Sequence, residues 1–190
     1  ANYSGRLQAT IHGVGIICWL VTVAWAIKMG MGLWGMPGPM GMSLVSFLVR
    51  WTFMMGAMML PSMAPLATLY GRTISSNHGI RLTAFGARYI LAWSITGLIA
   101  YLIADRFGDI AATRPVMAQV VAVICFATVG LYQLTPAKNR CLRHCRSPMG
   151  HLMHYAGFRG LTKDLRAGLH HGLFCLGCCW ALMILMIGFG

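Results

Sequence analysis

Long apolar runs alternate with short polar segments along the whole chain. The runs cover residues 13–29, 46–70, 85–104, 116–134 and 169–190. Each is close to the ~20 residues that a helix needs to cross ~30 Å of hydrocarbon, and the first can continue to Leu33. None shows the period-two alternation of a membrane β-barrel strand. The pattern therefore predicts an all-α, polytopic transmembrane helix bundle of five spans that forms a single transmembrane domain over residues 1–190.

The two ends of the chain carry further expectations. The first apolar run is too long for a cleaved signal peptide, so we interpret it as a true span. The sequence stops at Gly190 inside apolar residues, and this leaves room for a sixth span that the sequence does not contain.

Composition agrees with the membrane interpretation. Hydrophobic residues make up 58% of the chain and charged residues 9%, with a mean hydropathy of +0.69, and so little charge cannot cover a soluble globule of this size. The acidic residues are Asp105, Asp109 and Asp164, and none lies deep in an apolar run. A chain with so few carboxylates, none of them deep in an apolar run, is a poor candidate for a carboxylate-driven pump or a paired-carboxylate hydrolase. The chain has no HExxH, GxSxG, Walker-type or CxxCH motif, so we expect neither haem nor nucleotide binding, and we favour a role that is not enzymatic while leaving an enzyme open.

Positive charge sets the expected orientation. The net charge is +12, and most basic residues lie between spans, in segments 71–84 and 136–168. Basic loops stay on the cytoplasmic side, so these segments and the N-terminus are expected in the cytoplasm, and segments 30–45 and 105–115 outside. We expect no nucleic-acid binding, because no recognised module or basic helix face supports it.

The basic segment 136–168 has two interpretations. Aromatic and aliphatic residues alternate there with histidine, arginine and lysine, which suits a short interfacial helix among lipid headgroups. A solvated loop that fixes topology explains the same residues, and the sequence leaves both alternatives open.

Five of the seven cysteines lie at the two ends of this basic segment. The group comprises Cys141, Cys145, Cys175, Cys178 and Cys179, and His171 lies four residues before Cys175. Spacings of three and four residues place each set on one helix face, and the two sets can meet if the fourth and fifth spans are neighbours. Cysteines in a reducing cytoplasm persist as thiols, which suit copper(I) or zinc. The alternative is that the cysteines are small buried hydrophobes, an interpretation that fits Cys18 and Cys125 well.

Methionines form a second group of sulfur donors in the second span. Met55, Met59 and Met63 repeat every four residues, and thioethers bind copper(I) in preference to hard cations. Methionine also fills irregular cores, so packing is the alternative interpretation. With a rise of 1.5 Å per residue, Met63 and Cys175 both lie about 10 Å below the cytoplasmic interface, which predicts that the Met59/Met63 face approaches the Cys175/Cys179 face.

Three segments resemble a bacterial family of predicted metal-binding integral membrane proteins. They are MMGAMMLPSMAP at 54–65, YQLTPAKNRCLRHCRSP at 132–148 and HHGLFCLGCCWALM at 170–183. The resemblance implies a multi-pass protein of the bacterial inner (plasma) membrane with a metal-related role. It directs attention to Met54, Met55, Met58, Met59, Cys141, Cys145, Cys175, Cys178 and Cys179.

Three functional hypotheses follow. The first is a membrane protein that binds copper(I) or zinc through its clustered cysteines, for metal trafficking, tolerance or delivery to a metalloenzyme. The second is an accessory structural subunit of a larger respiratory or photosynthetic membrane complex. The third is a membrane thiol-disulfide oxidoreductase, which requires the cysteines outside the cytoplasm, against the charge bias.

Overall fold

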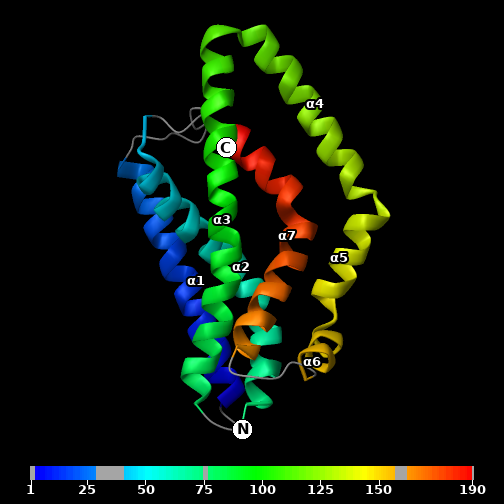
Figure 1. Ribbon diagram of the computed structural model, residues 1–190. Helices are drawn as coiled ribbons and strands as arrows, with labels where there is room; N and C mark the ends of the chain where they lie inside the picture. The colour runs from blue at the N-terminus through cyan, green and yellow to red at the C-terminus, as the bar shows by residue number, and fades with distance from the viewer. Residues whose placement is uncertain (1–2, 29–40, 75–76, 157–161, 190) are drawn as a thin grey trace.

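The chain is a bundle of helices in the computed structural model (Figure 1), which describes residues 3–28, 41–74, 77–156 and 162–189. The helices are α1 (Tyr3–Lys28), α2 (Leu44–Arg72), α3 (His78–Thr113), α4 (Pro115–Gln133), α5 (Pro136–Arg146), α6 (Pro148–Ala156) and α7 (Lys163–Phe189). The described ranges contain no strand. Helices α1, α2, α3, α4 and α7 are long and apolar enough to cross a membrane, which confirms the predicted all-α architecture and its five spans.

The third span is much longer than the apolar run that predicted it. Helix α3 has 36 residues, or about 54 Å at 1.5 Å per residue, so it exceeds the hydrocarbon thickness. The expectation of a connecting segment over 105–115 is therefore wrong, because the helix continues through Asp105 and Asp109 to Thr113. Arg114 alone separates α3 from α4, and Pro115 supplies the first residue of the new helix, a position where its missing N–H costs nothing.

The basic segment 136–168 is largely helical in its described part. It contains α5, α6 and the start of α7, with Pro136 and Pro148 beginning the two short helices. Two short helices thus lie where the sequence left a single interfacial helix and a solvated loop as alternatives, and α7 begins at Lys163, six residues before the apolar run. Residues 157–161 of this segment lie outside the described ranges, as do Met29 at the end of the first predicted run and residues 30–40 of the predicted outward-facing segment 30–45.

Helix α2 packs between α1 and α3, while α7 runs along α3 (Figure 1). The largest fully buried side chains are Trp93, Tyr89, Phe85 and Met55, all on α2 and α3. Helix α4 leans away from the bundle, and Val129 is its buried residue. The fourth and fifth spans meet near the end of α4, where the Tyr132 hydroxyl donates to the Gly177 carbonyl at 2.5 Å.

Helices α3 and α7 approach each other closely because α7 has glycine at the contact. A Cβ atom on Gly168 would lie 2.2 Å from the carbonyl oxygen of Phe85, and one on Gly172 would lie 3.1 Å from the Cβ of Ala92. Small residues allow helices in a membrane to pack backbone against backbone. The contact positions the following turns of α7, which carry the cysteines, against the core.

A buried ion pair joins the ends of three helices on the side where α7 begins. Asp164, in the first turn of α7, accepts hydrogen bonds from the Arg81 guanidinium at 3.0 to 3.2 Å and from the Tyr70 hydroxyl at 2.5 Å. Asp164 is buried, and Arg81 compensates its charge. The contact ties α7 to α2 and α3 about three turns before the first cysteine of α7.

Candidate metal centre

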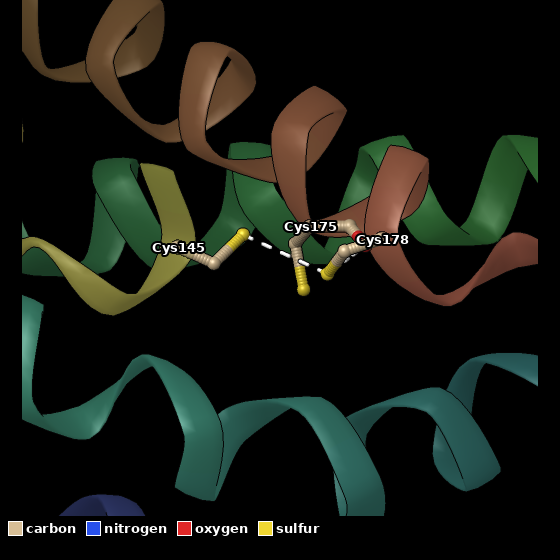
Figure 2. A group of neighbouring side chains, drawn as sticks. All are labelled: Cys145, Cys175 and Cys178. Carbon is tan, nitrogen blue, oxygen red and sulfur yellow. Dashed lines mark hydrogen bonds between the residues drawn. The ribbon is translucent and has the colours of Figure 1, made fainter. Parts of the chain in front are cut away.

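Three cysteines from two helices converge beside the core. Cys145 projects from α5 toward Cys175 and Cys178 on α7 (Figure 2). The three sulfur atoms all lie within 4.8 Å of one another, and the sulfurs of Cys145 and Cys178 are 3.7 Å apart. The predicted meeting of the CLRHC and CLGCC segments is therefore present in the fold.

Local structure explains how each thiol reaches this point. Cys175 and Cys178 are three residues apart on α7 and share one face. The Cys178 thiol donates to the Cys175 carbonyl oxygen at 3.1 Å, which holds its side chain against the helix. Helix α5 packs along α7 and supplies Cys145 from the opposite side. Cys175 and Cys178 are buried and Cys145 is partly buried, so the cluster is largely shielded from solvent. Its more exposed side is the short helix α5, which carries Cys145.

The sulfur separations suit coordination of one metal ion. A metal–sulfur bond of about 2.3 Å places two ligands about 4.0 Å apart in a trigonal site and about 3.8 Å apart in a tetrahedral one. The 3.7 Å between Cys145 and Cys178 lies near these values, and Cys175 lies within 4.8 Å of both. An ion could therefore bind the three thiols with little movement of the backbone.

Two further cysteines flank the group. The sulfur of Cys179 lies 3.3 Å from that of Cys178. Cys141 lies one turn before Cys145 on α5, and a Cβ atom on Gly177 would lie 2.9 Å from its sulfur, so Cys141 packs against α7. All five predicted thiols thus lie along the α5–α7 contact. The other two are elsewhere, with Cys18 on α1 against Gly56 and Cys125 on α4.

Helix α2 contributes a thioether at the edge of the cluster. The sulfur of Met59 lies 4.0 Å from that of Cys175, which confirms that the Met59 face of α2 approaches the cysteine face of α7. Met55 and Met63 are buried in the same core, and no described contact places their sulfur atoms beside a thiol.

Tyr89 belongs to this site and was not anticipated from the sequence. It is fully buried on α3, and its hydroxyl lies 3.1 Å from the Cys175 sulfur and 3.4 Å from the Met59 carbonyl oxygen. A single tyrosine in an apolar run carries no periodic signal. A buried phenol nevertheless needs a hydrogen-bond partner, and this requirement could have indicated that Tyr89 contacts a polar group or a sulfur atom inside the bundle.

His171 lies beside the group of thiols rather than within it. Its buried ring stacks on Tyr89, with ring centroids 5.4 Å apart, and on Phe85 at 6.5 Å. It thus contacts the tyrosine that reaches Cys175, and it is not a member of the close group formed by Cys145, Cys175 and Cys178.

The thiol of Cys145 keeps its proton at neutral pH. Its hydrogen bond with Cys175, and then its burial, raise the pKa of Cys145 to about 12, although the hydrogen bond with Cys178 acts in the opposite direction. Metal binding to this thiol therefore has to displace a proton.

Comparison with protein families gives one finding. A family model described as a copper chaperone, PpoB2, matches residues 48–190, a range that contains α3 to α7, nearly all of α2 and all five clustered cysteines. No curated protein and no solved structure matches the chain.

Proposed function

The chain belongs to the PpoB2 family of copper chaperones, and from this premise we propose that it is a membrane-embedded chaperone that holds copper(I) between α5 and α7. The ligands are Cys145, Cys175 and Cys178, and Cys141 and Cys179 are alternates on the same contact. The convergence of three thiols from two helices is the observation that carries the proposal.

The chemistry of the donors favours copper(I) over zinc. Structural zinc takes four ligands in a tetrahedron, whereas copper(I) accepts two or three soft sulfur ligands. The close group in the described residues has three members, and the sulfur donors beside it are the Cys179 thiol, 3.3 Å from Cys178, and the Met59 thioether, 4.0 Å from Cys175. A thioether is a poor ligand for zinc and a good one for copper(I). The copper description of the family points the same way.

The proposed site suits an ion in transit. Cys175 and Cys178 lie on a long helix fixed against α3, while Cys145 lies on a short helix outside the five spans. The positive charge of segment 136–168 supports a cytoplasmic location for this end of the bundle, at the inner face of a bacterial inner membrane. Copper(I) is the cargo there, and the acceptor is a copper-dependent metalloenzyme or its assembly partner.

Copper(I) titration of the purified full chain tests this function. In detergent, under anaerobic conditions, a chromophoric copper(I) chelator competes for the ion and reports its stoichiometry and affinity. We expect one tightly bound copper(I) per chain, lost in the Cys175→Ser/Cys178→Ser variant and kept in Cys125→Ser, the matched control on α4. Wild-type protein that fails to retain copper(I) against the chelator, or that prefers zinc in a parallel titration, would overturn the proposal.

A further inference from the structure

A sulfur-rich core continues from the three thiols into the membrane-spanning part of the bundle. Met59 lies on α2, is 5% exposed, and places its thioether sulfur 4.0 Å from the Cys175 sulfur. The same core contains Met55 and Met63 from α2, together with Met54, Met58 and Met183 at its margin. Cys175 is therefore the point at which a thiol cluster and a row of buried thioethers meet.

The separation of the two sulfur atoms matches a bridging ion. Two ligands at about 2.3 Å from one metal in a trigonal site lie about 4.0 Å apart, which is the observed distance between Met59 and Cys175. The Met59 side chain is buried, and the backbone that carries it accepts hydrogen bonds from the Tyr89 and Ser62 hydroxyls at the Met59 carbonyl oxygen. The side chain therefore needs no large rearrangement to share an ion with Cys175.

We propose that Met59 is a thioether ligand in a second copper(I) position, which it shares with Cys175 and which adjoins the three-thiol position. This inference rests on the proposed copper function and adds a donor from a third helix, α2. The second position links the thiol cluster to the row of methionines and marks the side from which copper(I) enters or leaves it.

Exchange between the two positions conserves charge and electrons. Copper stays in the +1 state throughout, so no oxidant or reductant is needed. When the ion moves from the second position to the three-thiol position, its bond to the neutral Met59 thioether breaks and bonds to the sulfurs of Cys145 and Cys178 form. Each of these two thiols releases its proton to water as its bond forms, and Cys175 remains a ligand in both positions.

X-ray absorption at the copper edge tests the assignment directly. The full chain is produced with selenomethionine, loaded with one and then two equivalents of copper(I), and examined for a copper–selenium scattering shell. We expect that shell in the wild type at two equivalents, its loss in Met59→Leu, and its retention in Met117→Leu, a matched control on the exposed face of α4. Leucine keeps the volume and apolar character of methionine, so the fold is expected to persist.

The outcomes separate this proposal from the one on which it rests. If copper shows a sulfur shell from cysteine but no selenium shell at one or at two equivalents, the role of Met59 is overturned and the thiol site remains supported. An unchanged selenium shell in Met59→Leu would assign the thioether to another methionine and would likewise overturn it. Failure of the chain to hold any copper(I) would remove both proposals.

Discussion

The hydroxyl of Tyr89 lies 3.1 Å from the sulfur of Cys175, so a residue of α3 reaches directly into a thiol cluster built by α5 and α7. Tyr89 is fully buried, and the same hydroxyl lies 3.4 Å from the Met59 carbonyl oxygen of α2. The phenol has one proton and two acceptors. It can donate to the carbonyl while Cys175 is a thiol, and to the sulfur when Cys175 is a metal-bound thiolate.

Tyr89→Phe is therefore expected to weaken copper(I) binding. The substitution keeps the stacked ring and removes the hydrogen bond to the thiolate, and a hydrogen bond to a charged group contributes about 1.5–3 kcal/mol. The dissociation constant should rise about tenfold or more in the chelator competition assay. Tyr101→Phe is the matched control, because that hydroxyl contacts the Met42 carbonyl, away from the cysteines. Equal affinities of both variants would show that the phenol has no part in binding.

Copper(I) affinity should increase with pH. The pKa of Cys145 is raised to about 12, so this thiol is protonated throughout the neutral range, and protons compete with the metal. Each displaced proton makes the apparent affinity rise about tenfold per pH unit. Titrations at about pH 6.5 and about pH 7.5, with the chelator corrected for its own protonation, measure the slope. Cys145→Ser should make the slope shallower, and an affinity independent of pH would contradict a thiol ligand.

Asp164→Asn should destabilise the bundle. The change leaves the Arg81 guanidinium beside a neutral side chain, and breaking a buried pair costs about 3–5 kcal/mol, although the partial exposure of Arg81 reduces that figure. Thermal unfolding in detergent, followed by tryptophan fluorescence, measures the loss. Asp109→Asn, at an exposed position on α3, is the control and should unfold like the wild type. If both variants unfold at the same temperature, the ion pair does not stabilise the fold.

Gly168→Ala should also be destabilising, for a steric reason. The added Cβ would lie 2.2 Å from the Phe85 carbonyl oxygen, so α7 would have to move away from α3 at a cost of about 1–3 kcal/mol. Gly130→Ala on α4 is the matched control, because nothing lies within 4 Å of its added Cβ. Alanine in an open helix position stabilises by up to about 1 kcal/mol. The two variants should therefore shift the unfolding temperature in opposite directions, and a common direction would argue against the close contact.

The long apolar runs were sufficient to predict the five spans, because crossing a bilayer demands length and apolar character that nothing else in the chain requires. Their ends were predicted less well. Asp105 and Asp109 looked like loop residues because they are charged, yet α3 continues through both, and its 36 residues make it longer than the hydrocarbon layer is thick. Local composition therefore predicted the apolar spans better than it predicted the helix ends.

The site was predicted in part. Spacings of three and four residues placed the cysteines on shared helix faces, and a depth argument brought Met59 near Cys175. Neither argument could find Tyr89 or the pairing of Asp164 with Arg81, because these contacts depend on how α3 and α7 are rotated and packed. The glycines that set this packing, Gly168 and Gly172, have no hydrophobic or charged signature of their own.

The close packing of α7 on α3 means that the two sides of the thiol cluster are held in place to different degrees. One side, with Cys175 and Cys178, is immobilised by backbone contact at Gly168 and by the ion pair of Asp164. The other side is α5, a helix of 11 residues that contributes Cys145. We therefore expect a bound copper(I) ion to be released when α5 moves away from α7. This movement removes Cys145 and lowers the coordination number of the ion by one, while the rest of the bundle stays rigid. An acceptor that engages this short helix would govern the timing of release without unfolding any membrane span.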